Sequence, residues 1–301
     1  MGTNDFLNKI INDDCVKVMQ SFDNDSIDLV VTSPPYDGLR VYNGYEFNLD
    51  KITQELFRVI KKGGVVVWVI SDATVNGSET GTSFKHALKF IESGFNLHDT
   101  MIFRKRNPIP QIYRRRYNNE FEYMFVFSKG LVSTHNPIRV ECLHAGLELS
   151  TTTYKNYSKG KQKREKLANP VKSTKIKGNI WDYVVGKNKE DQDAKGHPAP
   201  FPCKLAEDHI LSWSNEGDVV LDPMCGSGTT CKMAAQLGRK YIGVDVSEEY
   251  CNIAKQRVGL NEPLDSNLHQ LLEQRRAEAS RGEVSKKSIT EVSEEVIQNR
   301  A

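Results

Sequence analysis

The sequence lacks the features that define several classes of protein. None of its 301 residues lies in an apolar run near the roughly 18 to 20 residues that a membrane-spanning helix needs. We therefore expect no membrane span. The first fifteen residues show no basic stretch followed by an apolar one, the pattern of a secretory signal. We expect a cytoplasmic protein.

Cysteine is sparse and dispersed. The six cysteines form no CxxC pair, and they stand at Cys15, Cys142, Cys203, Cys225, Cys231 and Cys251. A disulfide framework in a chain of this length would need a denser pattern. The seven histidines lie near no second ligand at zinc spacing. We expect neither disulfides nor a metal site.

Charge is nearly balanced but unevenly placed. The chain has 41 basic and 39 acidic residues, a net charge of +2. Six bases and no acid fall within 104–116, and nine bases with one acid fall within 151–178. Two basic segments are the electrostatic pattern expected of a protein that contacts phosphates. A flexible basic loop would explain 151–178 equally well.

Strand and helix patterns alternate along the chain. Buried strands are predicted at 27–31, 65–70, 123–129, 217–223 and 240–246, and helices at 49–64, 84–95, 204–214, 229–238 and 247–258. Alternation of this kind is typical of βαβ units around a mostly parallel sheet. The sequence therefore predicts an α/β fold.

The alternation is interrupted once. Between 131 and 195 the periodicity gives way to polar, basic sequence, which we interpret as an insertion in the α/β scaffold. It separates a first half, 1–130, from a second half, 196–258. A charged helix and tail are expected at 259–301, where eight acids stand against six bases.

A glycine-rich turn follows the predicted strand VVLD. Asp222 begins DPMCGSGTT, which leads directly into a helix, and Gly226 and Gly228 allow the backbone to approach a ligand closely. Asp245 ends the next strand, where it could accept hydrogen bonds from ribose hydroxyls. The third glycine of GxGxxG and the Gly-Lys-Ser/Thr of a P-loop are both absent. The pattern predicts a nucleotide-type site; an exposed strand-end acid is the alternative for Asp245.

A second motif, TSPPY, follows the strand at 27–31. Pro34 and Pro35 fix the backbone and remove two donors, so the carbonyls of the turn are free to accept hydrogen bonds. The Ser33 hydroxyl and the Pro34 carbonyl could hold an amino group, while Tyr36 offers a ring for stacking. An ordinary proline-rich turn is the alternative.

Together, these motifs resemble those of the beta-class amino-group DNA methyltransferases. TSPPY precedes HPAPFP and DPMCGSGTT, which is the permuted order of that class, and the likeness covers roughly residues 10–258. It also includes NDDC, RVIKKGG, RRRYNNEFEYMFVFSKG and GNIWDY. The resemblance implies a Rossmann-like sheet that uses S-adenosyl-L-methionine, with 131–195 as an inserted target-recognition region.

The resemblance also implies roles for particular residues. The pocket for the target amine would be Ser33, Pro34, Pro35 and Tyr36. The cofactor-binding residues would be Asp14 at the adenine end, Asp245 at the ribose, Asp222, Pro223, Gly226, Ser227, Gly228 and Thr229 at the methionine portion, and His197, Phe201 and Pro202 around the pocket. DNA phosphates would be contacted by Arg104, Lys105, Arg106, Arg114, Arg115 and Arg116. Phe121 and Glu122 stand where the family often has His-Glu, a departure from its pattern.

The implied reaction is attack of an exocyclic amine on the sulfonium methyl, with the base flipped out of the DNA duplex. No cysteine nucleophile is needed, and Cys225 is interpreted as packing. In this family Ser-Pro-Pro-Tyr usually accompanies the N4 amine of cytosine and Asp-Pro-Pro-Tyr the N6 amine of adenine. Ser33 therefore favours cytosine, with adenine as the alternative.

Two other classes of protein remain open at this stage. An RNA or protein methyltransferase normally has the cofactor motif first, and a DNA-binding protein without activity would not need both motifs intact. The expected partners are double-stranded DNA and a cognate restriction endonuclease. An orphan regulatory enzyme is the alternative, and the chain could act as a monomer or a homodimer.

Overall fold

The computed structural model describes residues 2–35, 47–108, 110, 116–143, 145–146, 152–156, 161–165, 172–186 and 202–259, the two segments 152–156 and 161–165 by their backbone alone. Five of the predicted site residues lie outside the described residues: Tyr36, Arg114, Arg115, His197 and Phe201. The charged helix expected after Gly259 lies outside them as well.

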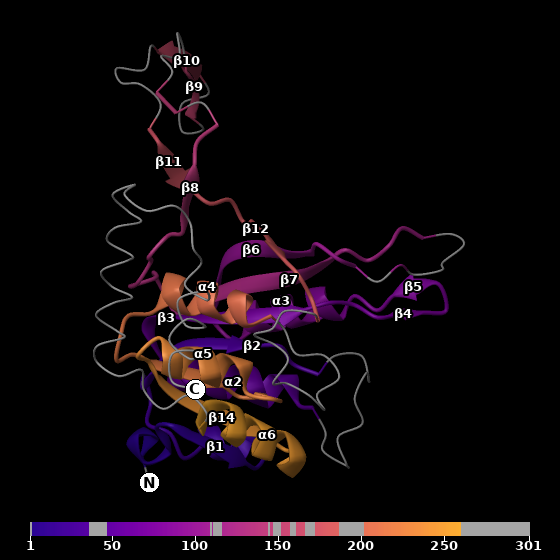
Figure 1. Ribbon diagram of the computed structural model, residues 1–301, viewed down its shortest axis with the longest axis vertical. Helices are drawn as coiled ribbons and strands as arrows, with labels where there is room; N and C mark the ends of the chain where they lie inside the picture. Colours follow the sequence, from indigo (N-terminus) through magenta and orange to yellow (C-terminus); the bar gives the residue numbers. More distant parts are fainter. Residues whose placement is uncertain are drawn as a thin grey trace, which may run out of the picture.

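A sheet of eight strands forms the centre of the molecule, in the order β1-β14-β13-β2-β3-β7-β6-β12 (Figure 1). The strands are β1 (Lys9–Asn12), β14 (Lys240–Asp245), β13 (Val219–Asp222), β2 (Ile27–Thr32), β3 (Ile60–Ile70), β7 (Phe121–Ser128), β6 (Asn96–Lys105) and β12 (Ile180–Tyr183). From β1 to β3 all neighbours are parallel; β7 is antiparallel to β3 and β6, and β12 is parallel to β6. The predicted mostly parallel sheet is confirmed.

Helices cover both faces of this sheet. They are α1 (Cys15–Met19), α2 (Leu49–Val59), α3 (Thr82–Glu92), α4 (Cys203–Trp213), α5 (Thr229–Gln236) and α6 (Glu248–Gly259), with a 3-10 turn, η1 (Thr3–Phe6), before β1. Side chains of β3 alternate between the faces. Val66 and Trp68 pack with α1, α2 and α3, whereas Val65 and Val67 pack with α4 and α5. The result is a three-layer α/β/α fold.

The helix expected at 49–64 is shorter than the sequence pattern indicated. It ends at Val59, and β3 begins immediately at Ile60. Ile60 pairs with Ile27 of β2, and the Lys61 Nζ atom lies 2.7 Å from Asp28 Oδ1. Residues 60–64 therefore form a strand because they pair with β2, although their local sequence resembles the end of a helix.

Part of the segment at 131–195 leaves the body of the molecule as an arm. Two ladders build it: β8 (Arg139–Glu141) with β11 (Thr174–Ile176), and β9 (Thr152–Asn156) with β10 (Lys161–Glu165). Figure 1 shows the arm rising from the sheet. The end of the same segment returns as β12, the edge strand of the central sheet. The segment thus forms both the projecting arm and the edge strand of the central sheet.

A small hairpin, β4 (Thr74–Val75) with β5 (Ser78–Glu79), joins β3 to α3. None of the helices in the described part of the chain is long and apolar enough to cross a membrane.

Candidate functional site

The candidate site lies at the carboxyl ends of four neighbouring parallel strands. Thr32, Asp222 and Asp245 end β2, β13 and β14, and Asn12 ends β1. Ligands of open α/β sheets bind at this edge. A cavity of about 430 Å³ opens there, within the range of small-molecule sites. Its lining is Asp14, Cys15, Val16, Lys17, Gln20, Pro35, Phe47, Asn48, Lys51, Ile52, Pro223, Met224, Asp245 and Val246.

Asp245 is nearly buried and is held by backbone donors. Its Oδ2 accepts a hydrogen bond of 2.8 Å from Gly226 N, and its Oδ1 accepts one of 2.9 Å from Ser247 N. The Asn12 side chain donates to its carbonyl at 3.0 Å. Asp245 also lines the cavity, where a carboxylate is an acceptor for the hydroxyl groups of a ligand. This geometry fits the predicted ribose contact.

Asp222 connects the two predicted motifs. Its Oδ1 accepts 2.7 Å from the Thr32 hydroxyl, at the end of β2, and 3.2 Å from Met224 N. The side chain is 1% exposed, and this burial raises the pKa of Asp222 to about 7. Pro223 and Met224 line the cavity next to it. Asp222 therefore fixes the glycine-rich turn against the strand that leads to Ser33.

Glycine is required in the turn between β13 and α5. Gly226 and Gly228 have φ values of +50° and +79°, in the left-handed region that disfavours other residues. A Cβ atom on Gly228 would lie 2.7 Å from the Ala254 Cβ atom of α6. The turn and α6 consequently pack more closely than any side chain would permit.

A buried arginine of α6 holds this turn in place by hydrogen bonds. Arg257 of α6 is 2% exposed, and its Nη1 donates to Ser227 O at 2.7 Å, Ser227 Oγ at 3.0 Å and Thr229 Oγ1 at 3.1 Å. Its Nη2 lies 3.9 Å from the Cys203 Sγ atom, at the start of α4. Ser227 and Thr229 were predicted as cofactor ligands; both hydroxyls bond Arg257, and neither residue lines the cavity.

Sequence reasoning missed Arg257. The available signal was its place in α6 beside the buried Cys251, Ala254 and Val258, where an arginine must find partners inside the protein.

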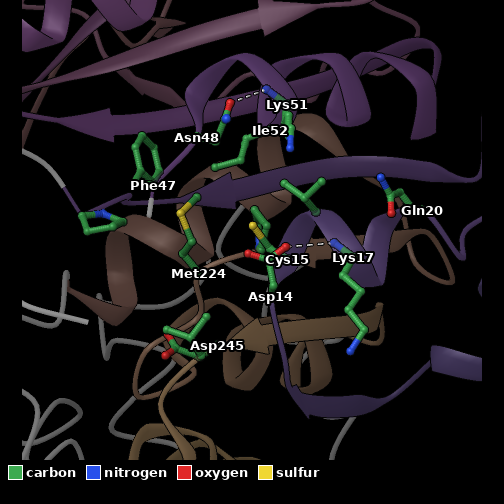
Figure 2. A pocket seen from close by; sticks show the side chains of 14 residues that line it. Asp14, Cys15, Lys17, Gln20, Phe47, Asn48, Lys51, Ile52, Met224 and Asp245 are labelled. Atoms are coloured by element: carbon green, nitrogen blue, oxygen red, sulfur yellow. Dashed lines mark hydrogen bonds between the residues drawn. The ribbon is translucent and has the colours of Figure 1, made fainter. Parts of the chain in front are cut away.

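The wall opposite Asp245 comes from the start of α1 and of α2 (Figure 2). Asp14 caps α1, and its Oδ1 accepts 3.0 Å from Lys17 N. Burial raises the pKa of the Cys15 thiol to about 12, so it stays neutral. Phe47 and Asn48, just before α2, were not predicted, because nothing local in the sequence relates them to the glycine-rich turn.

The predicted amine pocket adjoins this cavity. Ser33 is half-buried, Pro34 is buried, and Pro35 lines the cavity. Tyr36 lies outside the described residues. Pro202, the remaining described member of the predicted cofactor set, is buried at the N-cap of α4 and does not line the cavity.

The cysteines near the site are in packed surroundings. Cys203 follows Pro202 directly and is buried in the first turn of α4. A hydrogen bond with Cys231 and burial raise the pKa of the Cys225 thiol well above its usual value. Such thiols are poor nucleophiles, in keeping with the interpretation of Cys225 as packing. Among the described residues, no three His, Cys, Asp or Glu side chains gather as a metal site.

The described basic residues predicted to contact phosphates are paired with acids. Arg104 Nε and Nη2 donate to the two Asp182 carboxylate oxygens at 2.6 and 2.9 Å. Arg106 lies 4.0 Å from the same carboxylate. The other two pairs are Lys105 with Glu122 at 2.7 Å, and Arg116 with Glu79 at 3.3 Å. The Arg104–Asp182 and Lys105–Glu122 pairs join β6 to β12 and to β7, and all four contacts neutralise part of the basic charge within the chain.

The fold and the cavity define an S-adenosyl-L-methionine-dependent methyltransferase. The strand order brings Asp245, the glycine-rich turn between β13 and α5, and Pro35 together at the carboxyl edge of the sheet, around the cavity. The chain belongs to the DNA methylase family of N6 and N4 amino-methyltransferases, which it matches over residues 27–256.

Relatives agree with this assignment. The orphan methyltransferase M.BamHII of Bacillus amyloliquefaciens is 53% identical over 237 residues, covering 77% of this chain and 89% of its own. The type II methyltransferase M.HinfI of Haemophilus influenzae is 29% identical, covering 85% and 69%. The predicted class of enzyme and its cofactor are confirmed.

Solved structures share the fold. The PvuII DNA methyltransferase, described as cytosine-N4-specific, superposes with a TM-score of 0.63 at 21% identity over 86% of each chain. TTHA0409 of Thermus thermophilus, in complex with S-adenosyl-L-methionine, gives 0.56 at 27% identity, covering 85% of this chain and 94% of its own.

Proposed function

We propose that this DNA methyltransferase modifies the exocyclic N4 amine of a cytosine that is flipped out of duplex DNA. The observation that carries the proposal is Ser33, which stands first in Ser33-Pro34-Pro35 at the end of β2, beside the cavity. In the family that this chain belongs to, serine at this position usually accompanies cytosine and aspartate adenine. The similarity to the PvuII methyltransferase, at 21% identity, supports the fold but not the choice of target base.

When bound, S-adenosyl-L-methionine supplies a methyl group on a positively charged sulfur. The chain's own contribution is to hold the amine. The Ser33 hydroxyl and the Pro34 carbonyl can each accept one of its hydrogens, which leaves the nitrogen lone pair directed toward the methyl. The transfer forms an N–C bond, breaks an S–C bond and releases one amine proton. Tyr36 stacks on the flipped base.

The remaining predicted roles follow the geometry of the cavity. Asp245 accepts from the ribose hydroxyls and Asp14 faces the adenine end. The Thr32–Asp222 hydrogen bond of 2.7 Å keeps the amine turn and the glycine-rich turn in a fixed relation. A rigid relation between the two reactants is where much of the rate enhancement of a transfer reaction originates.

Sequence recognition is assigned to 131–195, with its arm of β8 to β11. The arm extends away from the sheet, where it could reach the grooves of a duplex beside the site (Figure 1). The basic residues at 104–106, at the end of β6, and Arg116, before β7, would release their acidic partners and bind DNA phosphates instead. We propose the units 1–130, 131–195, 196–258 and 259–301 on this basis.

The proposed setting is a restriction-modification system with a cognate endonuclease. The names of the relatives cover two arrangements: M.HinfI is a type II methyltransferase, whereas M.BamHII is called orphan. Digestion of DNA from cells that express the chain, with endonucleases of known specificity, identifies the protected site and the nuclease specificity that would match it.

The base is tested by nucleoside mass spectrometry. Unmodified DNA is incubated with the full chain and cofactor labelled on the methyl group, then digested and analysed. N4-methylcytosine is the expected product, lost in Ser33→Ala and Tyr36→Ala while cofactor binding survives. N6-methyladenine instead would contradict the cytosine assignment and leave the family assignment intact.

A further inference from the structure

Three side chains connect the hydrophobic core to the wall of the cavity. Phe47 lines the cavity just before α2, and Figure 2 shows its ring there. This ring lies nearly parallel to the imidazole of His86, with 5.6 Å between the centroids and 8° between the planes. The Trp68 Nε1 atom in turn donates a hydrogen bond of 3.1 Å to His86 Nδ1. We call Phe47, His86 and Trp68 the Phe47 stack; of the three, Phe47 alone lines the cavity.

The inner part of this stack is firmly packed. Trp68 is fully buried in β3, inside the central sheet, and its indole packs edge-on against Phe90 with 4.8 Å between centroids. His86 is 6% exposed and lies on the same side of α3 as Phe90, four residues away. Both Trp68 and His86 belong to regular elements within a close-packed core. Neither can change its rotamer without opening a gap there.

The hydrogen bond from Trp68 also selects one form of the imidazole. The indole nitrogen of tryptophan is a donor only, so His86 Nδ1 must be the acceptor. The His86 ring is therefore neutral, and its proton is on Nε2. Rotation of the ring about the Cβ–Cγ bond would break this hydrogen bond inside the core, which is costly. Trp68 thus fixes the plane of the imidazole that faces Phe47.

The start of α2 fixes the position of Phe47 but not the plane of its ring. Asn48 caps the helix, and its Oδ1 accepts a hydrogen bond of 3.0 Å from Lys51 N. Phe47 and Ile52 stand at the spacing of a hydrophobic staple, just before the cap and in the first turn, and both line the cavity. The cap and the staple spacing set where α2 begins. The plane of the half-buried Phe47 ring follows from the imidazole on which it stacks.

We propose that His86 is a positioning residue for the cofactor: held by Trp68, it fixes the Phe47 ring as a flat surface against which the adenine of S-adenosyl-L-methionine packs. The inference rests on the proposed placement of the cofactor in this cavity. Asp14, the residue proposed for the adenine end, lines the same cavity. Adenine is the planar aromatic part of the cofactor, and a ring that is already held in place loses little freedom when another ring packs on it.

The first test measures the cofactor Kd of the full chain by isothermal titration calorimetry. Phe47→Ala should raise the Kd by about tenfold. His86→Leu should raise it by about fivefold, because leucine has neither a flat face nor an acceptor. His86→Asn keeps an acceptor close to the position of Nδ1 and should recover most of the affinity. A wild-type Kd in His86→Leu would overturn the proposal.

Phe95→Leu is the matched control for His86→Leu. Phe95 is buried in the same core, where its ring lies 5.5 Å from that of Phe90, and it does not line the cavity. This variant should lose stability, measured by urea unfolding, and keep the wild-type cofactor Kd. An equal rise of the Kd in Phe95→Leu and His86→Leu would show that general loosening of the core controls binding.

Trp68→Phe tests the inner hydrogen bond. This variant keeps an aromatic ring in the core but removes the donor, and it should raise the cofactor Kd by about threefold. Because Trp68 and His86 act on the same ring, the double variant Trp68→Phe/His86→Leu should bind the cofactor about as well as His86→Leu alone. Effects that multiply in the double variant would contradict action through one path.

Nitrogen NMR of the histidine side chains reads the tautomer directly. The signals that are absent from the His86→Asn spectrum belong to His86. In the wild-type chain at neutral pH they should show a proton on Nε2 and none on Nδ1, both before and after the cofactor is added. A proton on Nδ1 would exclude the hydrogen bond from Trp68 and with it the proposed support of Phe47.

S-adenosyl-L-homocysteine tests which part of the cofactor packs on Phe47. It lacks the methyl group and the positive charge but keeps the adenine, so Phe47→Ala and His86→Leu should weaken both ligands by the same factor. A loss confined to S-adenosyl-L-methionine would contradict the adenine contact. Asp245→Asn, titrated alongside, separates this inference from the placement of the cofactor. If Asp245→Asn weakens binding while the Phe47 and His86 variants do not, the cofactor occupies the cavity and the role of His86 is wrong.

Discussion

At the scale of single residues, the site depends on a few buried polar side chains that form hydrogen bonds between distant segments of the chain. Arg257 bonds the backbone and hydroxyl groups of the glycine-rich turn, and Asp222 bonds the end of β2. Neither lines the cavity. Their effect on the reaction is therefore positional, through the turn that they hold.

Arg257→Met should weaken cofactor binding beyond its effect on stability. Removing three hydrogen bonds from a buried turn is expected to lower the free energy of unfolding by about 2–4 kcal/mol and to raise the cofactor Kd by about tenfold or more. Isothermal titration calorimetry measures the Kd. Arg257→Lys keeps the positive charge but lacks the several N–H donors of the guanidinium group. It should recover part of the cofactor affinity that Arg257→Met loses.

Arg239→Met is the matched control for that variant. Arg239 is also buried, and it bonds the Ser214 carbonyl and hydroxyl at 2.9 and 3.2 Å, outside the cofactor turn. It should lose comparable stability and keep the wild-type Kd. Equal loss of binding in both variants would mean that general destabilisation, and not the turn, controls affinity.

Asp222 should give the unliganded protein a defined pH dependence. Burial raises its pKa to about 7 when folded, whereas an unfolded aspartate titrates near 3.9. The folded chain then holds the proton more strongly. The stabilisation from this group is greatest below about pH 4 and falls as the pH rises toward 7, by up to about 1.4 kcal/mol per pH unit.

Urea unfolding of the wild type and of Asp222→Asn from pH 5 to pH 8 checks this. The variant cannot titrate at this position, so the stability of the wild type relative to it should fall up to about pH 7 and then level off. Two curves that stay parallel from pH 5 to pH 7 would show that Asp222 is already ionised in the folded chain.

At the scale of elements, the buried strands and their helices were predictable, and the half-exposed strands were not. β2, β13 and β14 are short apolar runs that end at turn residues, so pattern alone located them. β6 alternates between exposed and buried residues and carries charge, so its local sequence resembled a basic loop. β12 lies in a polar segment and becomes a strand only by pairing with β6.

The candidate site shows the same division. Asp14, Pro35, Pro223 and Asp245 were predictable because each stands beside a recognisable motif, and all four line the cavity. The wall from the start of α2 depends on how distant segments meet, which a single sequence does not encode locally. The bonds of Ser227 and Thr229 to Arg257 were likewise hidden, because the partner lies about thirty residues further along the chain.

The edge strand β12 should depend on its ion pair with β6. Hydrogen bonding to Arg104 lowers the pKa of Asp182, so the carboxylate is charged at neutral pH. Both side chains are partly exposed, so Asp182→Asn should have little effect on global stability. Amide hydrogen exchange in residues 180–183 should nevertheless become faster.

Asp25→Asn provides the control for this variant. Asp25 pairs with Lys129 at 2.6 Å, away from β12, and is also partly exposed. Its loss should leave exchange in 180–183 unchanged. Unchanged exchange in Asp182→Asn would show that backbone pairing with β6 holds β12 by itself.

At the scale of the whole molecule, the order of the strands brings an early and a later part of the sequence into one site. β1 and β2 come from the first thirty-two residues, β13 and β14 from 219–245, and all four lie side by side. The cofactor cavity and the amine turn are thus separate in sequence and adjacent in space. Because different segments form the cofactor cavity and the amine turn, we expect that mutations can impair cofactor binding and methyl transfer separately.

The most direct test of this account compares Asp245→Asn with Ser33→Ala in the full chain, by cofactor titration and by single-turnover methyl transfer to unmodified DNA. Asp245→Asn should raise the cofactor Kd by about tenfold or more. Ser33→Ala should keep the wild-type Kd and slow the transfer by about 100-fold. Wild-type transfer by Ser33→Ala, or equal loss of binding in both variants, would contradict the division of the site into a cofactor cavity and an amine turn.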